Sequence, residues 1–378
     1  MNVAVNTLFY LPGEVGGSET YLRETLLAVA KNFPEIALQL ITNKENDTPL
    51  REQFSAFPQI SFSPLPLAAT NRYARIIAEQ TSLPRLLKKL RPDLLWSPGY
   101  TMPASAPCAQ AVSILDMQYR TYPEDLSPVA RWTTHALVSM ATRRADVILA
   151  ISEFSRDEIV RETGAASRLI HVTPLGVDPQ FGIDVGIARK EKVISKFIGS
   201  NSPFLLSVAH SYPHKNLPVM VNAFRLIADK IPHHVLLIGK PRRGEAVLQQ
   251  ALAAAPEGRV HRVEGVSREE LIALYQASSG FVFPSLYEGF GLPLLEAMLA
   301  GTPVLATGSG ATREVGGECC AYADGRDVRA WSKAMSDMLH LDDPVRGDVI
   351  AVARARASRF TWTESAALTI AAWRAALK

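Results

Sequence analysis

The 378-residue chain contains few of the features that stabilise exported proteins or span membranes. Its three cysteines, two of them adjacent at Cys319 and Cys320, have the spacing of neither a disulfide framework nor a zinc site. No apolar run approaches the ~20 residues of a spanning helix. The first residues, MNVAVNTLFYLP, have no basic segment before the apolar ones, so we expect no signal peptide. These absences favour a cytoplasmic protein in a reducing compartment.

Charge and metal-binding patterns are equally sparse. The formal net charge is +3, which is too small to indicate a nucleic-acid partner. The sequence contains no convincing Asp-x-Asp pair, no cluster of histidine and cysteine, and no pattern typical of a serine or cysteine catalytic triad. We therefore expect no metal and no cofactor. The hydrophobic fraction of 47% and the length predict a folded chain with two sizeable cores.

The most informative stretch is Gly280–Ala306, GFVFPSLYEGFGLPLLEAMLAGTPVLA. Its first four residues are an apolar run typical of a strand buried on both faces. Gly289 and Gly291 allow a tight turn and a close approach of the backbone to a ligand. Pro293 suits the first turn of a helix, where its missing N–H costs nothing. The stretch predicts a strand, a loop, a short helix and a second strand.

Two carboxylates frame the predicted helix. Glu288 lies in the loop before it, and Glu296 is expected in its first turn, with seven residues between them. The N–H groups of Gly291 and Leu292 would point out of the helix N-terminus, which is a ready anion site. A nucleotide-sugar needs such donors for phosphate beside acceptors for sugar hydroxyls. A simpler interpretation stays open, in which the loop is only a turn and Glu296 only complements the helix dipole.

The rest of the chain alternates strands and helices, which indicates α/β doubly wound sheets. Strands are expected at residues 2–9, 36–42, 60–63, 93–97, 111–115, 146–151, 169–173, 203–208, 234–238, 260–263, 280–283 and 303–306. A helix is expected at Tyr73–Leu90 with an interruption at Pro84. The rhythm breaks at Val177–Lys192, where we place a linker. Ligands bind beyond the carboxyl ends of parallel strands, which selects loops such as Ser97–Tyr100 and Asp116–Tyr119.

Two loops could hold phosphate. Gly16 and Gly17 lie between the first strand and a helix predicted at Thr20–Asn32. A strand, a glycine turn and a helix can cradle phosphate, although a plain strand-to-helix turn explains the pattern equally well. Lys215 follows the strand at residues 203–208. It can neutralise a diphosphate as a point charge, or it is simply an exposed loop residue.

The segment Arg72–Arg91 carries six basic residues and one acidic residue, interleaved with isoleucine and leucine. Basic amphipathic helices can lie on anionic membranes, so this segment is a candidate for peripheral membrane contact. Such a pattern is more often a helix with a solvated charged face. Both interpretations stay open at the level of sequence.

The run EGFGLPLLEAMLAGTPV, which begins at Glu288, resembles the E-x7-E signature of retaining glycosyltransferases of family 4. Lys215-Asn216 is similar to the family element whose lysine binds the donor diphosphate, and Gly16-Gly17-Ser18-Glu19 is similar to its N-terminal glycine loop. The resemblance covers nearly the whole chain. It implies the GT-B fold, in which two Rossmann-like doubly wound α/β domains face a central cleft.

The resemblance also implies domains and residue roles. It implies an N-terminal acceptor-binding domain at residues 1–180, a nucleotide-sugar-binding domain at residues 181–358, and a helix at residues 359–378 that returns to the first domain. Glu288 would hold donor-sugar hydroxyls, Glu296 the ribose, and Lys215 the leaving diphosphate without a metal. The implied catalytic residues are Glu288, Lys215 and Asp116, and the implied donor-binding residues are Gly16, Gly17, His210, Lys215, Val263, Glu288, Gly289, Phe290, Gly291, Leu292 and Glu296.

The chain departs from the family pattern at two places. Where many relatives have His-Asp facing the donor sugar, this chain has Leu115-Asp116, which leaves Asp116 as the candidate for a sugar or acceptor contact. Asp116 is equally well explained as a turn or cap residue. Where relatives have Gly-Arg before the lysine loop, this chain has Ala209-His210. Either His210 meets the phosphate, or Arg242 or Arg243 supplies the second charge.

These observations and the resemblance lead to one favoured function. We expect a metal-independent retaining hexosyltransferase, with mannose as the favoured sugar. It would transfer from a nucleoside-diphosphate sugar to a glycan or lipid-linked acceptor in surface polysaccharide or lipopolysaccharide biosynthesis. Two alternatives stay open: a sugar-nucleotide-binding protein without transferase activity, and a sugar-nucleotide epimerase of the same fold.

Overall fold

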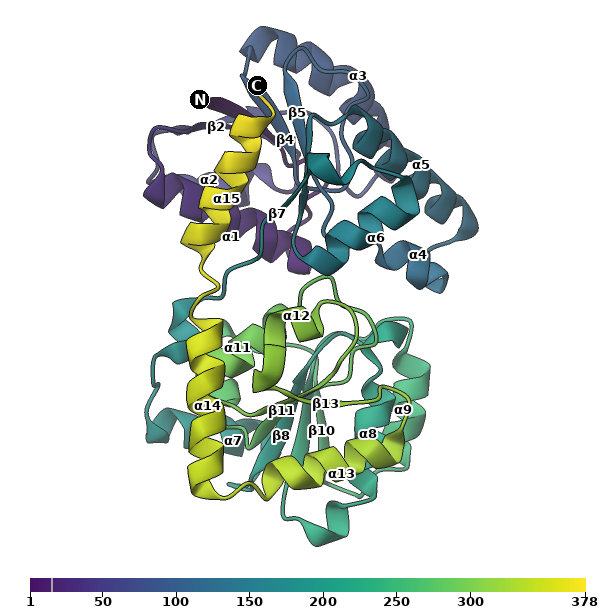
Figure 1. The fold of residues 1–378 in the computed structure, drawn as a ribbon, viewed down its shortest axis with the longest axis vertical. Helices are drawn as coiled ribbons and strands as arrows, with labels where there is room; N and C mark the ends of the chain where they lie inside the picture. Colours follow the sequence, from purple (N-terminus) through teal and green to yellow (C-terminus); the bar gives the residue numbers. More distant parts are fainter. Residues whose placement is uncertain (15) are drawn as a thin grey trace. The chain divides into compact units, whose positions relative to one another are not determined.

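The computed structural model describes residues 1–14 and 16–378. The chain forms two compact units, each built on a parallel sheet with helices packed against it (Figure 1). The first unit consists of Met1–Gly176 and Thr361–Lys378, and the second of Val177–Phe360. The α/β doubly wound architecture expected from the sequence is confirmed in both units.

The first unit has a seven-stranded parallel sheet in the order β3-β2-β1-β4-β5-β6-β7. Its strands are β1 (Asn2–Asn6), β2 (Ala37–Thr42), β3 (Ile60–Pro64), β4 (Leu94–Ser97), β5 (Ala109–Ser113), β6 (Val147–Ala150) and β7 (Ile170–Val172). The strand order reverses between β1 and β4. At such a switch point the loops diverge, which leaves room for a ligand beyond the carboxyl ends of the strands.

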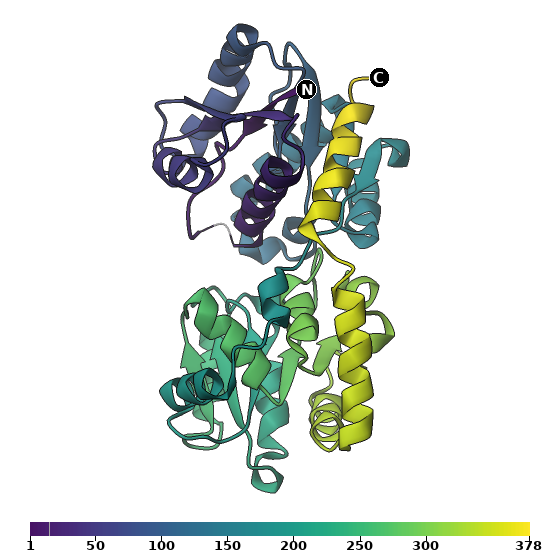
Figure 2. The ribbon, with the colours of Figure 1, turned by 90° about the vertical axis from the view of Figure 1, so that its left-hand side faces the viewer.

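Seven α-helices cover this sheet among the described residues: α1 (Gly17–Asn32), α2 (Asp47–Phe54), α3 (Arg72–Leu90), α4 (Gln118–Thr121), α5 (Pro128–Arg144), α6 (Glu153–Thr163) and α15 (Trp362–Ala375). Helix α15 comes from the end of the chain and lies beside α1 and β6 (Figure 2). Trp373 of α15 is fully buried and packs against Trp96 of β4, with ring centroids 5.2 Å apart. The burial of two large aromatic side chains explains why this distant segment joins the first unit.

The second unit has a six-stranded parallel sheet in the order β10-β9-β8-β11-β12-β13. Its strands are β8 (Phe204–Val208), β9 (His234–Ile238), β10 (Val260–Val263), β11 (Gly280–Phe283), β12 (Val304–Thr307) and β13 (Ala321–Ala323). Its helices are α7 (Ile187–Ile198), α8 (Leu217–Arg225), α9 (Glu245–Ala253), α10 (Arg268–Ala277), α11 (Leu292–Ala300), α12 (Thr312–Gly316), α13 (Val328–Leu339) and α14 (Asp343–Ala357). The central strands β8 and β11 are almost entirely buried, as continuous apolar runs in parallel sheets should be.

The structure overturns one expectation about local structure and narrows a second. Helix α3 continues through Pro84 without the expected interruption. Leu83 and Leu87 on either side of it are fully buried, and their burial offsets the one hydrogen bond that proline cannot donate. The chain leaves the first unit after Gly176, at the start of the proposed linker, and the segment Val177–Lys192 itself belongs to the second unit. Phe181 packs edge-on against Tyr275 there, with ring centroids 5.4 Å apart, so the turn-forming residues mark a packed turn.

Candidate functional site

The glycine-rich loop after β11 leads directly into α11, as the sequence predicts. Gly291 caps this helix with φ of 109°, in the left-handed region that side chains other than glycine rarely adopt. Pro293 follows in the first turn. The amide groups of a first turn have no partner inside the helix, and they carry the positive end of its dipole. The start of α11 is therefore suited to hold an anion.

Lys215 and Glu288 meet at the carboxyl edge of the second sheet. The Lys215 Nζ lies 2.6 Å from Glu288 Oε1, and the two side chains are only 21% and 11% exposed. Lys215 follows β8 and Glu288 follows β11, and these strands are paired neighbours at the point where the strand order reverses. Two residues that lie 73 positions apart in the sequence are thus joined by the sheet topology.

The backbone of Glu288 contacts the loop after β12, which was not among the loops predicted from the sequence to bind a ligand. Ala311 N donates a hydrogen bond of 3.0 Å to the carbonyl oxygen of Glu288. Gly310 has φ of +61°, and a Cβ at this position would lie 2.7 Å from the same oxygen. Only glycine fits there without displacing Glu288. The sequence signal was available, since Gly308-Ser309-Gly310 directly follows β12.

The loop that carries Lys215 is tied to the loop after β11. Asn216 adopts a left-handed conformation with φ of 53°, and its Nδ2 donates to the carbonyl oxygens of Pro284 at 3.3 Å and Gly325 at 2.6 Å. Leu286 N donates 2.7 Å to the carbonyl oxygen of His214. These bonds position the lysine backbone independently of the ion pair with Glu288.

His210 contributes a neutral imidazole to the same edge. Its Nδ1 accepts a hydrogen bond of 2.9 Å from Lys240 N, which places the ring proton on Nε2. Burial lowers the pKa of His210, and the charges of Arg242, Lys215 and Lys240 lower it further. His210 therefore offers an N–H donor without a full charge. The positive charge around it comes from the lysine and arginine side chains.

Glu296 lies in the second turn of α11, and the expectation that it lies in the first turn is wrong. The helix begins at Leu292, because Gly291 is needed as its left-handed cap. The Glu296 carboxyl accepts a hydrogen bond of 2.9 Å from Tyr275 Oη. Burial raises the pKa of Glu296 to about 7, although this hydrogen bond acts in the opposite direction. The helix dipole, which acts within the first turn, does not explain its position.

The remaining predicted donor-binding residues of the second unit also lie at the carboxyl ends of its strands, because Val263 ends β10 and Gly289 and Phe290 follow β11. The ring of Phe290 is buried and packs edge-on against Phe360, 5.9 Å away. Gly289 immediately precedes it. Val263 ends β10, and its carbonyl oxygen accepts a hydrogen bond of 2.8 Å from Gly239 N. Phe290 therefore offers a nucleotide no exposed side chain, whereas Val263 is partly exposed.

Gly16, Gly17 and Asp116 belong to the first unit. Gly16 caps α1 with φ of 55°, and α1 begins at Gly17. Val15, in the same glycine loop, lies outside the described residues. Asp116 Oδ1 accepts a hydrogen bond of 3.1 Å from Gln118 N, which is the geometry of a turn-forming aspartate. Its interpretation as a turn residue is therefore well supported by its surroundings.

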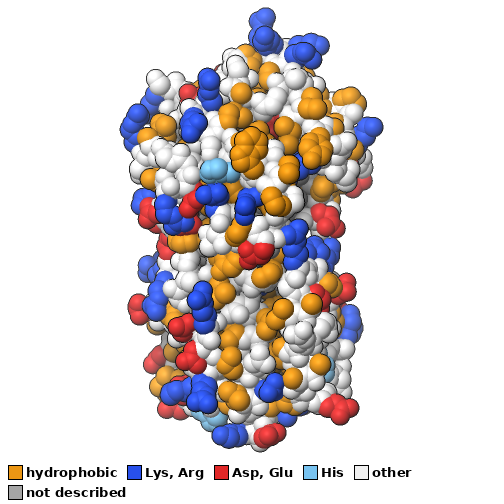
Figure 3. Space-filling view, turned by 90° about the vertical axis from the view of Figure 1, so that its right-hand side faces the viewer, with side chains coloured by type: hydrophobic (Ala, Val, Ile, Leu, Met, Phe, Trp, Pro, Cys, Tyr) orange, Lys and Arg blue, Asp and Glu red, His pale blue; other side chains and the backbone are white. Residues whose placement is uncertain are grey.

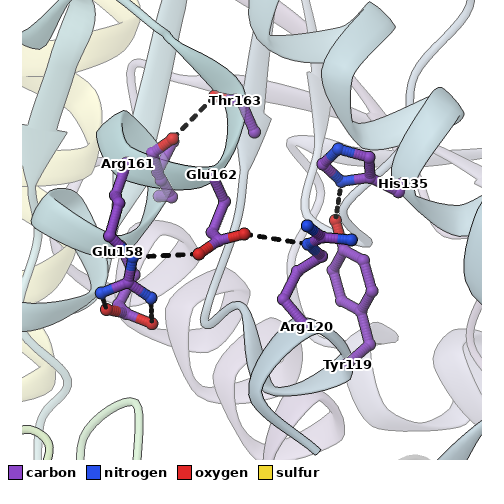
Figure 4. Close-up of polar contacts among 8 residues, drawn as sticks. Tyr119, Arg120, His135, Glu158, Arg161, Glu162 and Thr163 are labelled. Carbon is purple, nitrogen blue, oxygen red and sulfur yellow. Dashed lines mark hydrogen bonds and ion pairs between the residues drawn. The ribbon is translucent and has the colours of Figure 1, made fainter. Parts of the chain in front are cut away.

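The segment after Asp116 is anchored to two neighbouring helices (Figure 4). Arg120 of α4 pairs with Glu162 of α6 at 2.9 Å, and Tyr119 shares a hydrogen bond of 3.2 Å with Nδ1 of His135 on α5. Arg161 forms a further pair with the buried Glu158 within α6. These contacts hold α4 in place and so fix the direction of the loop that carries Asp116.

Within residues 1–14 and 16–378, no group of three or more histidine, cysteine, aspartate or glutamate side chains is arranged to hold a metal ion. No helix in the same part of the chain is both long and apolar enough to cross a membrane.

Comparison with known proteins defines the class of this fold and site. The family profile described as Glycosyltransferase Family 4 matches residues 15–181, and that described as Glycosyl transferases group 1 matches residues 188–356. The solved structure of Anabaena HepE in complex with UDP and glucose superimposes with a TM-score of 0.75 at 18% identity, over 99% of each chain. This likeness supports the expected GT-B fold. The chain belongs to the family 4 glycosyltransferases.

Two curated relatives are similar over much of their length. The O-antigen chain mannosyltransferase B of Escherichia coli is 32% identical over 233 residues, which is 61% of this chain and 61% of that protein. The MMP alpha-(1->4)-mannosyltransferase of Mycolicibacterium hassiacum is 30% identical over 258 residues, which is 66% of this chain and 59% of that protein. The matched regions thus span about three fifths of each relative.

Proposed function

We propose that this protein is a retaining hexosyltransferase that transfers a sugar, with mannose favoured, from a nucleoside-diphosphate sugar to a glycan or lipid-linked acceptor. The observation that carries the proposal is the Lys215–Glu288 pair beside the amide end of α11. It combines a cation, a helix N-terminus and a carboxylate at one sheet edge, which are groups for a diphosphate and for sugar hydroxyls. Two relatives named as mannosyltransferases support the choice of sugar. The first of them is named for the O-antigen chain, which supports a role in surface polysaccharide biosynthesis.

The ion pair suggests how the donor enters. The diphosphate replaces the Glu288 carboxylate as the partner of Lys215, and Glu288 becomes free to accept hydrogen bonds from the donor sugar. Lys215 and the first amides of α11 then stabilise the charge that develops on the diphosphate as the anomeric bond breaks. In the proposed reaction a hydroxyl of the acceptor attacks the anomeric carbon on the face from which the diphosphate leaves. The product therefore keeps the anomeric configuration of the donor. No step of this scheme requires a metal or a cofactor.

Two further residues complete the proposed donor site. The Nε2–H of His210 donates to a phosphate oxygen in the place of the arginine found in relatives, while Arg242 adds charge nearby. Glu296 accepts the ribose hydroxyls. Its carboxyl is already held by Tyr275, so it needs little reorganisation to do so.

The test is a panel of nucleotide-sugars that differ in base and sugar. The correct donor should raise the melting temperature, because a ligand that binds only the native state stabilises it. With an acceptor present, that donor should release its nucleotide and give a product of unchanged anomeric configuration. No stabilisation by any donor, or an inverted product, would refute the proposal. The Lys215→Ala variant should lose about two to three orders of magnitude in kcat, as expected for removal of a charge-stabilising group.

A second candidate is a sugar-nucleotide-binding protein without transferase activity. Leu115 favours it, because this residue is 5% exposed and offers no polar group where many relatives have a histidine. Calorimetry then decides between the two: saturable binding of a nucleotide-sugar without turnover, across a panel of saccharide acceptors, would support the binding protein. Turnover with any acceptor would exclude it.

We also propose that the protein acts in the cytoplasm, in peripheral contact with the inner face of the membrane. Four large apolar side chains are 62–75% exposed on two neighbouring helices, Tyr73 and Ile77 of α3 and Val129 and Trp132 of α5. Arg72 joins the helices, because its Nη2 donates to Ala130 O at 3.2 Å and to Thr134 Oγ1 at 2.7 Å. On the corresponding face, Figure 3 shows hydrophobic side chains among lysine and arginine.

The basic residues are not all available for this contact. Arg72 is engaged with α5, and Arg75 is largely withdrawn from solvent, so these two of the six basic residues of Arg72–Arg91 do not contribute to a membrane-facing surface. Lys88 is exposed and lies three helical turns from Ile77 on the same face. Aromatic and aliphatic side chains beside lysine suit the boundary of an anionic membrane.

Vesicle sedimentation tests the membrane contact. The protein should bind vesicles of phosphatidylglycerol and phosphatidylcholine but not of phosphatidylcholine alone. Replacing Tyr73 and Trp132 together by serine should abolish binding, whereas Val247→Ser, at an apolar position of the second unit that is 58% exposed, should not. Binding that survives the double replacement would refute the assigned surface.

A further inference from the structure

The loops that follow β8 and β9 of the second unit are held together around Ser211. Its backbone N–H donates to Lys240 O at 3.2 Å, and its carbonyl oxygen accepts a hydrogen bond of 2.7 Å from Gly244 N. Its hydroxyl oxygen accepts a further bond of 2.7 Å, from Arg242 N. One residue of the first loop thus fixes the backbone of the second loop, at residues 240–244.

The two loops approach each other more closely than most side chains would allow. A Cβ on Gly244 would lie 2.6 Å from the carbonyl oxygen of Ser211. Gly239, which directly follows β9, has φ of +148°, and a Cβ there would overlap the carbonyl oxygen of Ala209. A glycine therefore lies at each end of the second loop, where the lack of a side chain permits the contact.

The direction of the Ser211 hydroxyl is set by Glu245, which begins α9. Burial acts to raise the pKa of Glu245, but hydrogen bonds from side chains such as Ser211 outweigh this effect and lower the pKa. The Oε2 of the same carboxylate lies 3.2 Å from Arg262 Nη2. An ionised carboxylate can only accept hydrogen bonds. The Ser211 hydroxyl therefore donates its proton to Glu245 and presents a lone pair to Arg242 N.

Only a neutral His210 fits beside the second loop. Lys240 N donates to Nδ1 of the ring at 2.9 Å, and a protonated Nδ1 cannot accept this bond. Among the described residues, the charged groups that act on the ring come from both loops and from β10, and they are all positive: Arg242, Lys215, Lys240 and Arg262. Burial and these charges lower the pKa of His210. The ring therefore keeps one proton, on Nε2, while the backbone of Lys240 stays where Ser211 holds it.

We propose that Ser211 is a positioning residue of the donor site, which keeps His210 a neutral N–H donor toward the diphosphate through the backbone of residues 240–244. This inference rests on the proposed transferase function, in which the Nε2–H of His210 meets a phosphate oxygen. Ser211 is 2% exposed, so it acts through the second loop and does not contact the donor itself.

The proposal has a consequence for the pH dependence of donor binding. A neutral imidazole that donates one hydrogen bond takes up no proton when the diphosphate binds. The affinity that His210 contributes should therefore be constant between about pH 6 and pH 8. An imidazole released from Lys240 N would instead protonate closer to its ordinary pKa of about 6.5 and would attract the diphosphate more strongly at low pH.

The first test observes the imidazole of His210 in the free protein. Long-range proton–nitrogen NMR near neutral pH should show one tautomer, with the proton on Nε2, and His210→Gln identifies its signals. Ser211→Ala removes an anchor of the second loop and should give a mixture of both tautomers. The matched control is Ser207→Ala, because Ser207 of β8 is 1% exposed and its hydroxyl has no hydrogen-bond partner among the described residues. This control should keep the wild-type tautomer, and a pure Nε2–H tautomer in Ser211→Ala would overturn the inference.

The second test is calorimetry with inorganic pyrophosphate between about pH 6 and pH 8. Each protein is compared with the same protein carrying His210→Gln, so that the titration of pyrophosphate itself cancels. In the wild type and in Ser207→Ala, the ratio of the two affinities should not change with pH. In Ser211→Ala the ratio should be about fivefold smaller at pH 8, because the N–H is misdirected, and it should rise again by about fivefold toward pH 6 as the ring gains a charge.

Glu245→Gln provides a second route to the same result should Ser211→Ala fail to fold. A glutamine at this position can donate as well as accept, so the direction of the Ser211 hydroxyl is no longer fixed, and the same pH dependence should appear. A ratio independent of pH in both variants, or no binding of pyrophosphate to the wild type, would overturn the inference. A purely structural role would lower the melting temperature and leave the tautomer and the ratio unchanged. Failure of every nucleotide-sugar to stabilise the protein would instead refute the transferase, while the tautomer of His210 would remain measurable.

Discussion

Removing the carboxylate of Glu288 should strengthen the binding of a diphosphate that carries no sugar. In the free protein the Glu288 carboxylate forms an ion pair with Lys215, with Oε1 and Nζ 2.6 Å apart. An incoming diphosphate must therefore displace the carboxylate from the lysine. Exposed ion pairs contribute about 0.2–1 kcal/mol, whereas hydrogen bonds to charged groups contribute about 1.5–3 kcal/mol. The side chains here are 21% and 11% exposed, which places this pair between the two classes. We take about 1–2 kcal/mol, or about a five- to thirtyfold change in affinity.

The assay is isothermal titration calorimetry with inorganic pyrophosphate and with nucleoside diphosphates. Glu288→Ala should bind them about five to thirty times more tightly than the wild type. Lys215→Ala should bind them more weakly, and transfer from a nucleotide-sugar should be lost in both variants. Asp337→Ala removes an exposed ion pair with Lys333 in the same unit and should leave the affinities unchanged. An unchanged or weaker affinity in Glu288→Ala would refute the competition between carboxylate and phosphate.

Three further outcomes are expected. Gly310→Ala should lower donor kcat/KM more than Gly258→Ala, because both have φ above +60° but only a Cβ at Gly310 meets the Glu288 backbone; equal activities would argue against this support. The melting temperature of Glu296→Gln should rise relative to that of the wild type as the pH increases from about 5 to about 8. The reason is that the raised pKa of about 7 makes ionisation of Glu296 unfavourable in the folded state. A difference in melting temperature that does not change with pH would contradict this prediction. Trp373→Ala should cost about 3–5 kcal/mol in urea unfolding, since the side chain is fully buried, and a loss below about 1 kcal/mol would be inconsistent with its packing on Trp96.

Local patterns predicted the elements that carry the donor site. The run at Gly280–Phe283 is a buried strand, and the glycine cap and Pro293 begin a helix as their backbone preferences require. Ser267 and Glu270 form a capping box at the start of α10, and their spacing of three residues is the sequence pattern of this motif. These features depend on a few neighbouring residues, so they can be recognised without the fold.

Other predictions failed because distant residues decide them. Pro84 was expected to interrupt α3, but burial of its neighbours in the first core outweighs one missing hydrogen bond. The turn-forming residues at Val177–Lys192 begin where the chain passes from one unit to the other, but Phe181 among them packs on Tyr275 in the second unit. The position of Glu296 was misjudged by one turn, because the exact start of α11 depends on the conformation of Gly291.

By itself, the sequence determined the α/β class, the family, and which residues near Glu288 and Lys215 are suited to a nucleotide-sugar. Tertiary structure alone decided which of these side chains touch. Glu288 and Lys215 meet because β8 pairs with β11, and Asn6 and Thr101 both donate to Glu79 because β1 pairs with β4. The physical reason is that strand pairing joins segments far apart in the chain, and their local residue patterns carry no record of that partner.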